Sequence, residues 1–175
     1  MKVFLSIILN TFVATMIVFI LMLIVDISFV VSFSSIMKHH AHDLTVILTN
    51  KRDNLARLSE ILVGHGVRLD KKKVESIHNF DVKRIDKQDG EDAKAARNEL
   101  TSLNEYFLSV ATQNDINDKS GEYQKILANI YELETVYRHH LMMYNADVLG
   151  YNFWISFFPT RFIYIILRFK PKENI

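Results

Sequence analysis

The chain has 175 residues, with 21 Lys and Arg against 20 Asp and Glu, so its formal net charge is only +1. A nearly neutral chain lacks the basic surface by which proteins bind nucleic acid, and we expect no nucleic-acid partner. It contains no cysteine, which excludes disulfides, thiolate metal sites, a cysteine nucleophile and a lipid-modified N-terminal Cys. The length allows one soluble domain at most.

The N-terminal segment is apolar enough to lie in a membrane. Residues 3–25 carry no charge and are mostly Ile, Leu, Val, Phe and Met. Roughly 20 such residues, rising about 1.5 Å each in a helix, span a bilayer. The run is too long for the apolar part of a signal peptide, and no clear Ala-x-Ala cleavage pattern follows it. It predicts a retained single-pass anchor, with the bilayer as a partner of the chain.

Asp26 ends the uncharged run, although apolar residues continue to position 37. An ionisable group inside a membrane is costly and often functional. We favour the alternative, in which the span ends near residue 25, Asp26 lies in the headgroup zone and a helical neck follows. More Lys and Arg residues follow the span than precede it, which favours a cytoplasmic main domain.

Apolar stripes run through the rest of the chain, which Gly64, Gly90 and Gly121 divide into segments. The striped residues, mostly three or four apart, are Leu44, Leu48, Leu55, Leu58 and Leu62, then Ala93, Ala96, Leu100, Leu103, Phe107 and Val110, then Tyr123, Ile126, Ile130, Leu133, Tyr137, Leu141, Tyr144, Val148, Tyr151 and Ile155. Such stripes predict amphipathic helices that need helical partners. We therefore expect an all-α protein in which a transmembrane anchor and neck (1–37) precede an antiparallel bundle of three to four long helices (38–175).

Local features refine this expectation. The segment 68–89 is mostly polar and predicts a shorter, exposed helix or an extension of a neighbour.

Asp118 or Ser120 can cap the last long helix, with Glu122 near the positive end of its dipole. Gly150 lies inside that helix at a cost of about 1 kcal/mol relative to Ala, for which a close approach between helices is a plausible reason.

The C-terminal third carries a spaced series of residues, Tyr144-Asn145, Tyr151-Asn152, Ile155, Phe158-Pro159 and Phe169-Lys170. This series resembles the C-terminal end of the LemA family of membrane-anchored helical proteins. The family has no assigned chemistry. The resemblance therefore implies a non-enzymatic scaffold or interaction protein at the membrane, with protein partners or self-association and no cofactor.

Two more segments carry the resemblance. Arg52-Asp53 and Leu58 match a motif in the family's first helix, and Glu134 matches its Thr-Glu motif. Ala56 replaces the family's Pro, so the kink that proline would cause is not expected here. The residues around Arg52-Asp53 more closely resemble the magnetosome version, MamQ, which implies a narrower role in forming the magnetosome membrane.

The paired Tyr and Asn residues also suggest a binding site. Tyr144-Asn145 and Tyr151-Asn152 are separated by seven residues, which is two helical turns, so both pairs repeat on one face. Because the tyrosines continue the apolar stripe, we favour core packing with satisfied side-chain hydrogen bonds.

Five of the histidines form two groups, His39, His40 and His42 near the anchor and His139-His140 on the last long helix. Paired histidine ligands on one helix prefer i, i+4 spacing, which neither group has. We therefore assign no metal ligand from the sequence. A metal-binding or metal-dependent membrane protein that uses these histidines is the alternative function.

Acidic pairs such as Glu132 and Glu134, or Asp115 and Asp118, could serve in acid–base catalysis. A charged helix face produces such pairs by default, and no nucleophile or glycine-rich phosphate loop stands near them in the sequence. We therefore expect no catalytic residue and no enzyme.

The segment 153–169 is rich in aromatic and aliphatic residues but contains Arg161. It is too short and too charged for a second span. Two placements remain open, one in the lipid headgroup region and one folded back over the core of the bundle.

Overall fold

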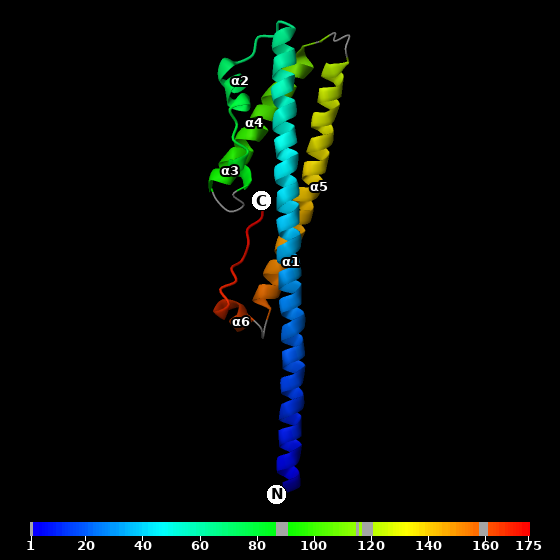
Figure 1. The fold of residues 1–175 in the computed structure, drawn as a ribbon, viewed down its shortest axis with the longest axis vertical. Coiled ribbons are helices and arrows are strands. Elements are labelled where there is room, and N and C mark those ends of the chain that lie inside the picture. The colour runs from blue at the N-terminus through cyan, green and yellow to red at the C-terminus, as the bar shows by residue number, and fades with distance from the viewer. Residues whose placement is uncertain (1, 87–90, 115, 117–120, 158–160) are drawn as a thin grey trace. The chain divides into compact units, whose positions relative to one another are not determined.

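A computed structural model describes residues 2–86, 91–114, 116, 121–157 and 161–175, and this part of the chain is helical with no strand (Figure 1). Its helices are α1 (Lys2–Gly64), α2 (Lys71–His78), α3 (Lys83–Asp86), α4 (Glu91–Gln113), α5 (Glu122–Ser156) and α6 (Arg161–Ile166). The all-helical class is thus confirmed.

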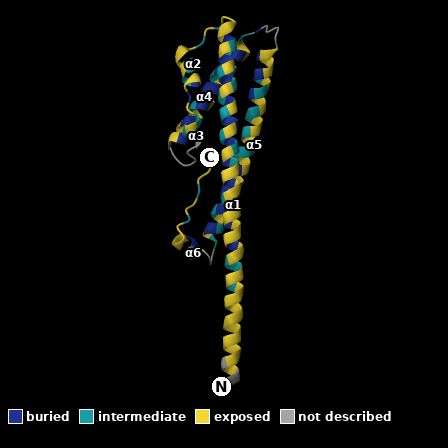
Figure 2. Ribbon diagram, viewed as in Figure 1, coloured by how far each residue is buried: buried dark blue, intermediate teal, exposed yellow. Residues whose placement is uncertain are grey.

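Helix α1 is long and apolar enough to cross a membrane. Large apolar side chains from Phe4 to Val31 are exposed around it, as Figure 2 shows, whereas a core helix would bury them. Its polar side chains bond to the helix itself, as when the hydroxyls of Thr11, Thr15 and Ser28 each donate to the carbonyl four residues earlier. The helix is unbroken to Gly64, so the predicted anchor, neck and first bundle helix are one helix.

The chain forms two compact units. The first comprises residues 1–38 and 145–174, and the second comprises residues 39–144 with Ile175. Helices α1 and α5 each contribute residues to both.

The core of the second unit consists of the apolar stripes of α1, α4 and the first part of α5. Its buried side chains include Leu48, Leu55, Leu58, Leu62, Ala96, Leu100, Leu103, Phe107, Tyr123, Ile126 and Ile130. These are positions that the sequence periodicity assigns to helix faces. Burial of apolar area at about 25 cal/mol per Å² is the main term that holds these helices together.

The polar segment after α1 forms two short helices beside α4 rather than one (Figure 1). The Asp70 side chain caps α2 by accepting from the Lys72 amide (2.9 Å), and the Asp70 amide donates to the Tyr106 hydroxyl on α4 (2.8 Å). In α3, Arg84 forms ion pairs with Asp92 and Glu99 of α4. The segment is therefore attached to α4 at both of its short helices.

Tyr123 near the start of α5 is tied to α4, because its hydroxyl donates to the Ala111 carbonyl over 2.8 Å. Glu122 lies in the first turn of α5, as predicted for an acidic residue near a helix N-terminus. Asp118 and Ser120, the predicted caps, lie outside the described residues.

In the first unit, α1 and α5 approach closely at Gly150. A Cβ atom at Gly150 would lie 2.7 Å from the Phe33 ring, so the expected close approach is the reason for glycine here. Phe29 stacks on Trp154 with ring centroids 4.6 Å apart. Asp26, which we expected at the membrane surface, is instead buried by protein, with 2% of its surface exposed.

Candidate functional site

The residues of the C-terminal series take structural positions on α5. Tyr144, Tyr151 and Ile155 are buried, and Asn145 and Asn152 are half-buried. The core-packing role that we favoured for the tyrosines agrees with this burial.

Asn152 holds the chain after α6. Its Nδ2 donates to the Lys172 carbonyl (2.8 Å), and its Oδ1 accepts from the Lys172 amide (2.9 Å). Nearby, Phe169 packs edge-on against the buried Tyr164, whereas Lys170 is exposed. The segment after α6 is thus held against α5 within the first unit.

Helix α6 also presents apolar side chains at the surface. Phe162, Ile165 and Ile166 are exposed on this short helix. Phe158 and Pro159, the other members of the C-terminal series, lie outside the described residues.

Glu134 is the partner of a buried lysine. Lys51 Nζ lies 2.6 Å from Glu134 Oε2, and only 4% of the Lys51 side chain is exposed. Arg138 binds the other carboxylate oxygen over 3.1 Å. Burial raises the pKa of the Glu134 carboxyl, but hydrogen bonds and positive charge from Lys51 and Arg138 outweigh this effect and hold the pKa below its usual value.

The first-helix motif residues have different surroundings. Leu58 is fully buried in the core of the second unit. Arg52 and Asp53 form a partly exposed ion pair at 3.3 Å. Such pairs contribute about 0–1 kcal/mol to stability.

The structure brings together one histidine from each group and an acid between them. His40 and Asp43 lie one turn apart on α1, and His140 faces them from α5. One ligand atom from each residue lies within 4.8 Å of the others. We call these three residues the His–Asp–His cluster. Figure 1 locates the two helices that supply it.

The cluster is partly shielded from solvent, and its two histidine rings are in contact. All three residues are half-buried, and the rings of His40 and His140 meet edge-on with centroids 5.6 Å apart. His140 Nδ1 lies 3.6 Å from Asp43 Oδ2, and the exposed His39 brings its Nε2 to the same distance from that oxygen.

The other two histidines of these groups, His42 and His139, are exposed. Asp43 was not predicted from the sequence, although it has the i, i+4 spacing to a nearby histidine that the histidines lack among themselves. It follows His39 by four residues and His40 by three, which places all of them along one turn of a helix.

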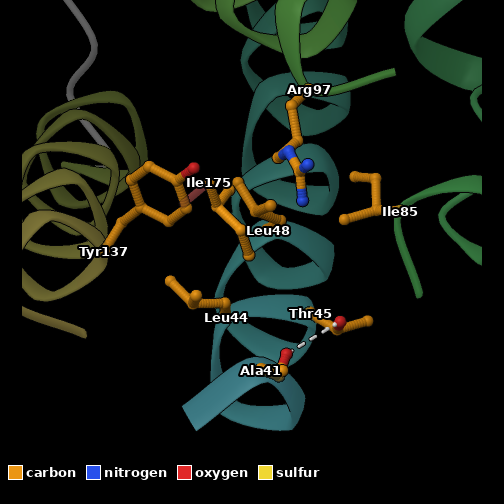
Figure 3. Close-up of a pocket in the computed structure, with 8 residues that line it drawn as sticks. All are labelled: Ala41, Leu44, Thr45, Leu48, Ile85, Arg97, Tyr137 and Ile175. Atoms are coloured by element: carbon orange, nitrogen blue, oxygen red, sulfur yellow. Dashed lines mark hydrogen bonds between the residues drawn. The ribbon is translucent and has the colours of Figure 1, made fainter. Parts of the chain in front are cut away.

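A small pocket opens in the second unit, lined by Ala41, Leu44, Thr45, Leu48, Ile85, Arg97, Tyr137 and Ile175 (Figure 3). Its walls are mostly aliphatic, and Thr45 uses its hydroxyl to donate to the Ala41 carbonyl. Burial raises the pKa of the Tyr137 phenol, with Arg97 lowering it and Glu134 raising it. The pocket therefore offers one guanidinium and one neutral phenol among apolar groups.

The acidic pairs do not form a catalytic arrangement among the described residues. Glu132 is exposed, Glu134 is committed to Lys51 and Arg138, and Asp115 and Asp118 lie outside the described residues.

Comparison with known proteins found no matching family model, no matching curated protein and no matching solved structure.

Proposed function

We propose that this chain is a single-pass membrane protein of the LemA type whose helical second unit acts as a non-enzymatic scaffold or interaction module. The observation that carries the proposal is the first part of α1, where apolar side chains are exposed from Phe4 to Val31. Exposed apolar area of this extent is unfavourable in water and favourable in a bilayer. The spaced Tyr-Asn series supports the family assignment.

A retained anchor and a cleaved signal sequence make opposite predictions for the mature protein. We expect the full chain to stay in the membrane pellet after alkaline carbonate extraction. Intact-mass measurement of that material should retain residues 1–37. A mature chain that has lost its first 25 or more residues and is found in the soluble fraction would refute the anchor.

The proposal includes a cytoplasmic second unit and a protein partner or a second copy of the chain. Lys and Arg residues after the span support this orientation. Protease added to inverted membrane vesicles should then degrade the second unit, whereas protease added to intact cells or spheroplasts should not. Cross-linking of the anchored chain, followed by mass spectrometry, identifies self-association or a partner.

The narrower proposal is a role in forming the magnetosome membrane. It is supported by Arg52-Asp53-Asn54-Leu55, the residues that resemble MamQ. The chain should then co-purify with magnetosomes from its source cell. A source genome without magnetosome genes would eliminate this narrower role and leave the scaffold proposal intact.

A further inference from the structure

We infer that the His–Asp–His cluster binds a divalent first-row transition-metal ion, zinc or iron(II), which links α1 to α5. The inference is independent of the proposed scaffold function. It is based on three side chains from two helices whose ligand atoms already lie within 4.8 Å of one another.

The donor set selects this class of metal. Two imidazole nitrogens and one carboxylate oxygen suit zinc and iron(II), whereas calcium and magnesium prefer oxygen ligands alone. Metal–nitrogen bonds of about 2.0–2.1 Å bring neighbouring ligand atoms to roughly 3.4 Å in a tetrahedral site. Side-chain rotations that shorten the separations between ligand atoms by up to about 1.4 Å would therefore complete the three bonds.

The Nδ1 atom of His140 also supports a bound metal ion. It is buried, and among the described residues it has no hydrogen-bond partner. The 3.6 Å separation from Asp43 Oδ2 exceeds the usual hydrogen-bond length. Because buried polar atoms are normally satisfied, an atom in this position is available to a bound ion.

Three protein ligands leave at least one coordination position open, as in zinc sites that accept water or a substrate. His39 is the nearest further donor, because its Nε2 also lies 3.6 Å from Asp43 Oδ2. It is exposed and can move toward an ion. The site thus has three half-buried ligands, and the exposed His39 at its edge is a candidate for a fourth.

Zinc titration of the full chain tests the inference. The protein would be purified in detergent with a histidine-free tag, stripped with a chelator and titrated with zinc by calorimetry. We expect saturation at one ion per chain, and an absorption band of a low-coordinate ion when cobalt(II) replaces zinc. Affinity should fall as the pH is lowered, since ligating imidazoles must be neutral.

Matched histidine variants decide where the ion binds. His140→Ala should weaken zinc binding about tenfold or more, at least as much as the loss of an outer-shell group does. Its neighbour His139→Ala, and His42→Ala beside Asp43, should bind zinc like the parent chain. His39→Ala should cause a smaller loss than His140→Ala.

Asp43→Asn keeps the shape of the side chain and removes its charge, so it tests the site even if His140→Ala fails to fold by circular dichroism. It should also weaken binding about tenfold or more. Zinc should raise the melting midpoint of the parent chain and not that of Asp43→Asn. Absence of saturable binding, or equal binding by the parent chain and Asp43→Asn, would overturn the inference.

Discussion

Lys51 on α1 and Glu134 on α5 form a charge pair at 2.6 Å in which the lysine is almost fully buried and the glutamate is partly exposed. This difference in exposure makes the stability of the pair depend on Glu134. A buried ammonium depends on its partner, because an unpaired charge away from water is far more costly than an unpaired charge at the surface.

Glu134→Gln should therefore lower the free energy of unfolding by about 2 kcal/mol, since the amide cannot neutralise Lys51. Thermal or urea unfolding of the full chain in detergent, followed by circular dichroism, measures the change. Glu132→Gln is the matched control, because Glu132 is exposed on the same helix. Equal stability of the two variants would show that the pair does not stabilise the unit.

Removing both charges should restore much of the loss. In Lys51→Met/Glu134→Leu, apolar side chains replace the pair and no buried charge remains. The double variant should be more stable than Glu134→Gln alone. A double variant that is less stable would mean that the two residues do not act as a pair.

The stability contributed by Glu134 should depend on pH. Its pKa is lower in the folded chain than the ordinary value of 4.5, so its contribution is complete above about pH 4.5 and is lost as the pH falls through the lower, folded-state pKa. The difference in stability between the parent chain and Glu134→Gln should shrink below about pH 4.5. A difference that stays constant down to the lowest pH at which both chains fold would contradict this.

Gly150→Ala should destabilise the first unit despite the helix preference of alanine. The new Cβ would lie 2.7 Å from the Phe33 ring, and overpacking costs of about 1–3 kcal/mol exceed the gain of up to about 1 kcal/mol in helix propensity. Melting in detergent should show a lower midpoint. Gly64→Ala, where a Cβ meets nothing within 4 Å, is the control.

Phe33→Leu in the Gly150→Ala background should relieve the strain. The two substitutions are then non-additive, as expected for residues in contact. Additive effects would indicate that the cost at Gly150 arises elsewhere.

Asn152→Ala should release the chain after α6, because both hydrogen bonds to the Lys172 backbone are lost. Limited trypsin digestion with mass spectrometry should show faster cleavage after Lys172. Asn152→Asp, which keeps the acceptor and loses the donor, should give an intermediate rate. Asn54→Ala, which removes a hydrogen bond from the Asn54 side chain to the Asn50 carbonyl of its own helix, should leave the rate unchanged.

Much of the fold follows from the sequence because its three long helices carry continuous stripes. Leu55, Leu58 and Phe107 are buried as their spacing predicts. The burial of Asp26 within the long helix α1 was not predicted, because an aspartate after an apolar run resembles the end of a membrane span whether or not protein covers it.

The candidate site could be predicted only in part, since its two halves are far apart in the sequence. His40 and His140 were recognised as members of two groups, but nothing in the sequence sets which turns of α1 and α5 face each other. Asp43 was not predicted, because the spacing of the histidines alone does not point to a carboxylate on the same helix. The burial of Lys51 could not be predicted for the same reason as the facing of the helices, because its partner Glu134 lies on α5, far away in the sequence.

The dependence of Lys51 on Glu134 has a consequence for how the chain is made. Lys51 precedes Glu134 by 83 residues in the chain, so the Lys51 ammonium has no Glu134 carboxylate to pair with until α5 has been synthesised. Covering the face of α1 that carries Lys51 with any apolar surface would strand a charge away from water. The Lys51 charge therefore favours an order of assembly in which this face of α1 stays hydrated until α5 is available to cover it.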